Sequence, residues 1–168
     1  MSINLFTFVD MYSKGLTTLA HILDKGATLA KSKGSTEDEM LEWRLVDDMN
    51  PVRFQAFVAI NYAKRWPARA AGVEVPPEIA SDLDYAGLRA AIDDAKTFLT
   101  TLKAEQFAGR DEVTHTENLG GFEPTLPLGQ WLTSFATTNF YFHLSMAYAI
   151  LRARGAELGK RDLFAGGL

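Results

Sequence analysis

Apolar residues recur at three- and four-residue steps in four long stretches of the chain, and this spacing places them on one face of an α-helix. The first stretch predicts a helix over residues 3–32 that ends before Gly34. The other three predict helices over residues 51–72, 84–103 and 128–154. Four amphipathic helices of this length favour an all-α fold, an up-down four-helix bundle with antiparallel helices.

The segments between these helices contain recognisable start and turn signals. Thr36 and Glu39 have the spacing of a capping box, which predicts a short extra helix. Asn50 and Pro51 suit the N-cap and the first position of the second long helix. Residues 110–127 alternate in polarity around the pair Gly120-Gly121, which predicts a small β-hairpin between the third and fourth long helices.

Composition narrows the class of protein. The chain has 168 residues, of which 47% are hydrophobic and 23% charged, as expected for one globular domain over residues 1–168. It contains no cysteine, which excludes disulfides and thiolate chemistry. The net charge of −4 argues against nucleic acid as a partner, and no apolar run is long enough to span a membrane. The first residues lack the basic region of a signal peptide, so a cytoplasmic protein is expected.

The last long helix carries polar residues within an apolar face. On a helical wheel Asn139 and His143 lie one turn apart among large apolar side chains, and Gln55 and Tyr62 belong to a similar stripe of the second helix. Polar groups in a core are costly unless they are satisfied, so we expect a polar pocket here. The predicted ligand-binding set is Gln55, Tyr62, Trp66, Asn139, Phe142 and His143, with Trp66 and Phe142 as apolar walls.

Two interpretations of this set stay open, a ligand site and a structural hydrogen-bond network that binds nothing. The candidate catalytic residues are His143 as a base and Tyr62 as an acid or hydrogen-bond donor. A metal is not expected, because Ala147 stands where a second ligand would follow His143, and the second helix has no histidine or acid. No cofactor is expected either, and His143 is only a weak candidate as a metal ligand.

Other polar residues are predicted to lie on the surface. His21 falls off the apolar stripe of the first helix, and His115 lies in the predicted hairpin. Arg65 and Arg69 are expected to form a solvated helix face together with Lys64. The last dozen residues are expected to form a tail.

A second apolar stripe on the last helix contains Phe140, Leu144 and Leu151. A helix that is apolar on two sides is either central in its bundle or in contact with another chain. The stripe either packs within the chain or contacts a second copy of it. The second interpretation predicts a homodimer.

The sequence resembles an uncharacterised family, known only as a domain of unknown function, that is grouped with the DinB/YfiT-like four-helix bundles. The resemblance covers nearly the whole chain. The segments that carry it are Arg44-Leu45, Asp48-Met49, Pro51, Ala70 to Glu74, Thr125 to Pro127, Asn139 to His143, Ala147 to Arg152 and Leu158 to Asp162.

The wider superfamily includes metal-dependent thiol transferases and isomerases, whose metal is held by a histidine of the second helix and a His-x-x-x-His pair of the fourth. Carried over residue by residue, only His143 remains, Ala147 replaces its partner, and Tyr62 falls where a histidine is often found. The resemblance therefore implies the fold and the place of the site, and it does not transfer metal chemistry. We expect a small-molecule-binding bundle without a metal triad. The alternatives are a DinB/YfiT-type transferase, isomerase or hydrolase that uses His143, and a structural or interaction protein without a ligand.

Overall fold

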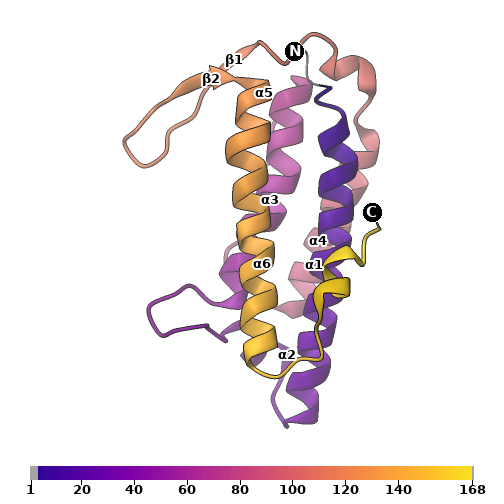
Figure 1. The fold of residues 1–168 in the computed structure, drawn as a ribbon, viewed down its shortest axis with the longest axis vertical. Coiled ribbons are helices and arrows are strands. Elements are labelled where there is room, and N and C mark those ends of the chain that lie inside the picture. Colours follow the sequence, from indigo (N-terminus) through magenta and orange to yellow (C-terminus); the bar gives the residue numbers. More distant parts are fainter. Residues whose placement is uncertain (1–3, 168) are drawn as a thin grey trace.

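The computed structural model describes residues 4–167, so the predicted helix start at residue 3 and the last residue of the chain lie outside the described part. The long helices are α1 (Thr7–Ser32), α3 (Val52–Ala71), α4 (Tyr85–Thr101) and α6 (Thr137–Ala153). The shorter elements are α2 (Glu37–Leu41), η1 (Ala104–Phe107), β1 (Thr114–Thr116), β2 (Thr125–Pro127), α5 (Leu128–Gln130), η2 (Trp131–Ala136) and η3 (Lys160–Phe164). The predicted helical fold with one small hairpin is confirmed (Figure 1). Among residues 4–167, no helix is long and apolar enough to cross a membrane.

Of the two helix starts for which we predicted a cap, only that of α2 has a side-chain cap. The predicted capping box before α2 is present, since Thr36 Oγ1 accepts from the Glu39 amide at 3.1 Å and Glu39 accepts from the Thr36 amide at 2.8 Å. The prediction that Asn50 caps α3 is wrong. Pro51 occupies the N-cap, and the Asn50 carbonyl instead accepts a hydrogen bond from Gln55 Nε2 at 2.9 Å.

The four long helices do not alternate in direction. The connection after α3 runs back along α3, so Glu78 pairs with Arg65 and the carbonyl of Leu83 accepts from Arg53, near the start of α3. α4 therefore begins beside the start of α3 and runs parallel to it. The predicted up-down order is wrong at this step, because a connection as long as a helix returns the chain to the end where α3 began.

α1 and α6 form the other parallel pair (Figure 1). The Tyr12 ring of α1 meets the Phe140 ring of α6 with centroids 5.1 Å apart. Further toward the C-terminal ends of both helices, the Gly26 backbone of α1 lies against Leu151 of α6. α6 runs antiparallel to α3, because His143 lies beside Gln55 at the start of α3. α3 and α6 therefore pack directly against each other.

The face of α6 that enters the core differs from the predicted one. Phe140, Leu144 and Leu151, which we expected to form a dimer contact, are all buried within the chain. A Cβ atom at Gly15 would lie only 2.4 Å from Cε1 of Phe140, so the missing side chain of Gly15 makes room for the ring. The stripe is therefore core and not a dimer surface, and homodimer formation itself stays a prediction.

The predicted hairpin is present at the end of the bundle where α3 ends and α6 begins (Figure 1). β1 and β2 are antiparallel, with His115 opposite Leu126. The turn contains Gly120 and Gly121, which have φ angles of 79° and 99° that favour glycine. Asn118 Oδ1 accepts from both of their amides, at 3.0 and 3.1 Å, and so holds the turn closed.

The last residues are packed on α1, and the predicted tail is wrong. Asp162 lies 2.7 Å from both His21 Nε2 and Lys25 Nζ, and it also accepts from the Gly159 amide at 2.7 Å. Thr18 of α1 accepts from the Gly166 amide at 3.2 Å. His21, which we expected to be an exposed surface residue, therefore contacts Asp162 and helps to hold the C-terminal segment against α1.

We predict that Gly15→Ala lowers the free energy of unfolding. The new methyl group would overpack the rigid Phe140 ring, at a cost of about 1–3 kcal/mol, and this exceeds the helix-propensity gain of about 0.5–1 kcal/mol. Gly26→Ala is the matched control with a smaller expected loss, because it meets the flexible end of Leu151. Urea unfolding measures both, and a stabilised Gly15→Ala variant would contradict the close contact.

Candidate functional site

Two of the predicted site residues, Gln55 of α3 and His143 of α6, are in direct contact where the two helices pack together. Gln55 is only 3% exposed. Its Nε2 donates to the Asn50 carbonyl, so its Oε1 faces His143 and accepts from Nδ1 at 2.8 Å. This pairing selects the imidazole tautomer with its proton on Nδ1. Burial lowers the pKa of His143 to about 4, so the ring is neutral at pH 7.

The other predicted residues do not join this pair. Tyr62 lies further along α3, beside Trp66 and Phe135, with ring centroids 6.5 and 5.9 Å away. Asn139 Nδ2 donates to the Phe135 carbonyl of its own helix at 2.8 Å. Phe142 is 52% exposed, so it does not wall a core pocket. The residues that we predicted to form a single polar pocket therefore lie at separate places along α3 and α6.

A hollow of about 150 Å³ lies around Tyr62 and Trp66, and we call it the hairpin hollow. α3 contributes Asn61, Tyr62, Arg65, Trp66 and Arg69 to its lining. Phe135 of η2 and residues 117–119 of the hairpin line the opposite side. The predicted pair Tyr62 and Trp66 thus belongs to a concave site, and His143 is not among the residues that line it.

An aromatic cluster forms the inner wall of the hairpin hollow. The Trp66 and Trp131 rings are stacked with centroids 5.2 Å apart, and Phe135 meets Trp131 edge-on at the same distance. Trp131 and Phe135 both belong to η2, a π-helical segment. Such segments are rare and are frequent at functional sites, because the extra residue changes the direction of the side chains.

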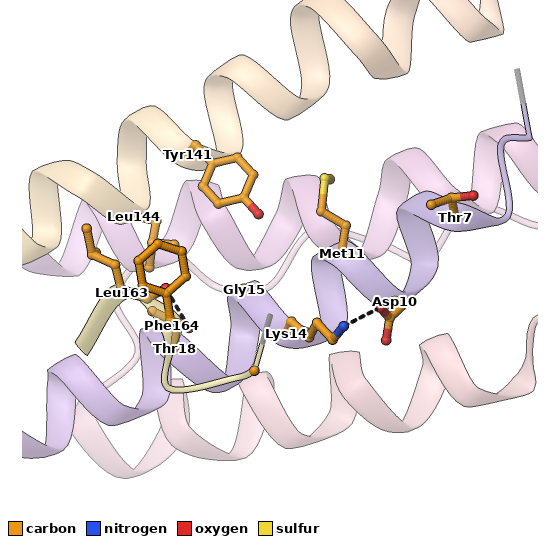
Figure 2. Close-up of a pocket in the computed structure, with 11 residues that line it drawn as sticks. Thr7, Asp10, Met11, Lys14, Gly15, Thr18, Tyr141, Leu144, Leu163 and Phe164 are labelled. Atoms are coloured by element: carbon orange, nitrogen blue, oxygen red, sulfur yellow. Dashed lines mark hydrogen bonds and ion pairs between the residues drawn. The ribbon is translucent and has the colours of Figure 1, made fainter. Parts of the chain in front are cut away.

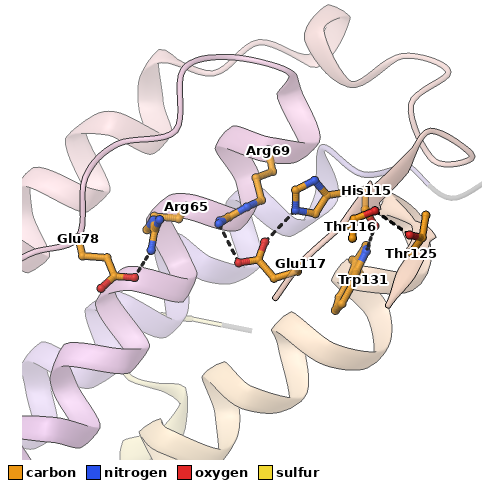
Figure 3. Close-up of polar contacts among 8 residues, drawn as sticks. All are labelled: Arg65, Arg69, Glu78, His115, Thr116, Glu117, Thr125 and Trp131. Atoms are coloured by element: carbon orange, nitrogen blue, oxygen red, sulfur yellow. Dashed lines mark hydrogen bonds and ion pairs between the residues drawn. The ribbon is translucent and has the colours of Figure 1, made fainter. Parts of the chain in front are cut away.

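Charged side chains line the hairpin hollow, and Figure 3 shows the ion pairs that they form. Glu117 lies 3.2 Å from Arg69 Nη2 and 2.8 Å from His115 Nε2. Arg69 also lies over the Trp66 ring, 5.0 Å from its centroid. Arg65 forms a second ion pair, with Glu78. Arg65 and Arg69, which we expected to be solvated, therefore line the hollow, and His115 contacts it through Glu117.

Burial changes the titration of two groups that line the hollow. It raises the pKa of the Tyr62 hydroxyl, and the nearby Glu117 carboxylate adds to this effect. Tyr62 thus keeps its proton at neutral pH and is able to donate a hydrogen bond. Burial also lowers the pKa of Arg69, although Glu117 opposes this shift. An arginine remains charged in either case, so the ion pair with Glu117 persists.

Two residues that line the hairpin hollow each have a buried nitrogen atom without a hydrogen-bond partner in the described part of the protein. The atoms are Asn61 Nδ2 and Arg65 Nε. Asn61 is only 6% exposed, and its Oδ1 accepts from the Ile79 amide at 3.1 Å. Because an amide N–H only donates, this contact fixes the orientation of the Asn61 side chain. No pattern in the sequence pointed to Asn61, since a lone asparagine on a helix is usually exposed.

A second, larger hollow of about 380 Å³ lies between α1, α6 and the C-terminal segment (Figure 2). Its walls are mostly apolar and include Met11, Tyr141 and Phe164. Thr18 at its base is bonded to the C-terminal backbone. Within residues 4–167, none of the buried polar atoms without a partner belongs to its lining. The hairpin hollow is the better candidate although it is smaller, because aromatic rings and charged or polar side chains line it together.

The described residues do not fit the metal site of the superfamily. Within residues 4–167, no three histidine, aspartate or glutamate side chains lie close enough together to hold a metal ion. His143 faces the Gln55 amide, and the nearest predicted partner position on its helix is Ala147. No chemical step is therefore derived through a metal.

The arrangement of the long helices is that of a DinB-like helical protein. Residues 6–164 match the family described as "Domain of unknown function (DUF1993)", and the chain belongs to this family. It is also similar to a DinB family member protein from Shewanella denitrificans of known crystal structure. The two are 30% identical with a TM-score of 0.86, over 95% of this chain and 91% of the other. No curated protein matches the chain.

We predict that an NMR titration of His143 gives a midpoint far below the ordinary value of about 6.5. The unfolded chain then binds the extra proton more readily than the folded one, so His143 lowers stability as the pH falls from about 6.5 to about 4. His143→Leu should remove this part of the pH dependence. Gln55→Glu should raise the midpoint, because it places a carboxylate beside Nδ1. An unshifted midpoint in the wild type would contradict the structure.

We predict that the purified protein holds no stoichiometric transition metal, because the described residues provide no set of three ligands. Elemental analysis after purification without added metal measures this. About one equivalent of metal per chain that is lost in His143→Ala would overturn the prediction.

Proposed function

We propose that this protein binds a small molecule in the hairpin hollow, without a metal triad. The observation that supports the proposal most directly is the lining of this hollow, in which the rings of Tyr62, Trp66 and Phe135 lie beside charged and polar side chains. The Tyr62 hydroxyl keeps its proton, so it is able to donate a hydrogen bond to a ligand. The aromatic wall of Trp66 and Phe135 supplies the apolar contact that ligand sites usually have.

The enzyme alternative has less support. A DinB/YfiT-type reaction at His143 would use the free Nε2 of the neutral imidazole as a base. His143 lies apart from the hairpin hollow, so a ligand bound there would not meet this nitrogen. We therefore retain Tyr62, Trp66 and the neighbouring α3 residues as the binding site, and assign Gln55 and His143 to a hydrogen bond that sets the register of α3 and α6. The exposed rings of Tyr141 and Phe142 replace the buried stripe as the surface on which we place the predicted homodimer.

We predict that a fragment library screened by NMR yields compounds that shift the Trp66 indole signal. Trp66→Leu should weaken such a compound by about tenfold or more, because it removes the wall of the hairpin hollow. Phe164→Leu is the matched control, since Phe164 lines the second hollow. A compound that is lost in Phe164→Leu and kept in Trp66→Leu would move the site to the second hollow. A library without any compound that binds near Trp66 would favour the structural interpretation.

A further inference from the structure

The inner wall of the hairpin hollow is almost closed to solvent. Trp66 lines the hollow, yet it is only 3% exposed. Trp131 is stacked on its ring with centroids 5.2 Å apart, and Phe135 and His115 meet it edge-on, each at 6.0 Å. Arg69 completes this cover, since its guanidinium lies over the ring at 5.0 Å from the centroid. A ligand that packs on the Trp66 ring therefore requires one of these groups to move.

Arg69 is the part of this cover that is best able to leave. Its long side chain ends in a guanidinium that is always charged, and burial lowers its pKa because the charged form loses contact with water. The Glu117 carboxylate lies 3.2 Å from Arg69 Nη2 and opposes this shift. Without Glu117, the guanidinium would therefore gain free energy by turning away from the Trp66 ring into solvent.

Glu117 belongs to the outer part of the hairpin, residues 117–124, which we call the hairpin arm. None of these residues is buried. Within residues 4–167, the pair of Glu117 and Arg69 is the only ion pair or hydrogen bond that joins the hairpin arm to a helix (Figure 3). A segment with so few buried contacts opens locally at low cost.

The base of the hairpin is held more firmly than the hairpin arm. Trp131 Nε1 donates to the His115 carbonyl at 2.8 Å, and the Leu128 amide donates to the Val113 carbonyl at 2.8 Å. These bonds join β1 and the start of α5 to the end of the bundle. The hairpin arm is therefore able to move while the two strands and the aromatic cluster stay in place.

We propose that Arg69 and Glu117 form a gate over the Trp66 ring, and that movement of the hairpin arm opens this gate to admit the ligand. This inference rests on the proposed function and adds how its site is opened. When the hairpin arm moves away, Arg69 loses the carboxylate that holds it over the ring and turns toward solvent. The Trp66 ring then becomes accessible from the hollow.

The test measures how far each tryptophan indole is exposed, by NMR with a soluble paramagnetic compound that broadens the signals of accessible groups. Glu117→Gln removes the charge that holds Arg69, so the broadening of the Trp66 indole signal should increase by about two- to fivefold, the range expected when a partly exposed ion pair is lost. The Trp43 signal is the internal reference, because the Trp43 carbonyl accepts from the Val52 amide at the start of α3, away from the hairpin.

Glu78→Gln is the matched control for this variant. It makes the same chemical change in the same hollow, but Glu78 pairs with Arg65 and does not belong to the hairpin. The Trp66 signal of Glu78→Gln should therefore match that of the wild type. Arg69→Ala removes the cover itself, so it should expose Trp66 at least as much as Glu117→Gln does. Adding Glu117→Gln to Arg69→Ala should then cause little further increase, because both changes act on one contact.

The wild-type protein provides a second measurement that needs no folded variant. About 1 M sodium chloride shortens the Debye length to about 3 Å, so it should weaken the pair of Glu117 and Arg69 and increase the broadening of Trp66. Increases in Glu117→Gln and at high salt, without one in Glu78→Gln, would support the gate. An unchanged Trp66 signal in Glu117→Gln and at high salt would overturn it, and so would an equal increase in Glu78→Gln.

These measurements use no ligand, so they separate the gate from the proposed function. A Trp66 signal that never responds, together with compounds that bind near Trp66, would overturn the gate alone. A Trp66 signal that responds as expected, together with a fragment library that contains no binder, would overturn the proposed function and with it the role of the gate in admitting a ligand.

Discussion

The rotation of α6 about its own axis is set by two close contacts with α1. Phe140 occupies the space beside Gly15, and Leu151 occupies the space beside Gly26. A side chain at either glycine would push α6 away, so these two contacts fix both the distance and the angular position of the helix. These contacts also determine which way the other side chains of α6 point, including those that face α3.

This rotation decides which predicted site residues meet. With Phe140 and Leu144 turned toward α1, His143 reaches the edge of α3 and pairs with Gln55, while Phe142 points outward. The π-helical turn of η2 then adds a residue before α6 begins, and it directs Trp131 and Phe135 toward Trp66. The aromatic wall of the hairpin hollow thus depends on the same helix whose position the α1 glycines determine.

Much of the fold could be predicted from local patterns, because the apolar spacing, the Thr36 capping box and the Gly120-Gly121 turn act over a few residues. The parallel arrangement of α3 and α4 could not, since it depends on where residues 73–84 pack. The choice of the wrong face of α6 has a similar cause. Two faces of α6 are apolar. Only the contact of Phe140 with Gly15, which is distant in sequence, determines which of them enters the core.

Only part of the lining of the hairpin hollow could be predicted from the sequence. Tyr62 and Trp66 were predicted because they belong to an apolar stripe, whereas Asn61 and Arg65 resemble ordinary surface residues in the sequence. The connection that returns along α3 determines their surroundings, since Ile79 binds the Asn61 oxygen and Glu78 pairs with Arg65. The segment that makes α4 parallel to α3 therefore also orients the Asn61 amide and neutralises one of the two arginines of the hollow. Bundle topology and the charge of the hollow are linked here, because a simple up-down connection would leave Arg65 without this carboxylate and the Asn61 amide free to turn.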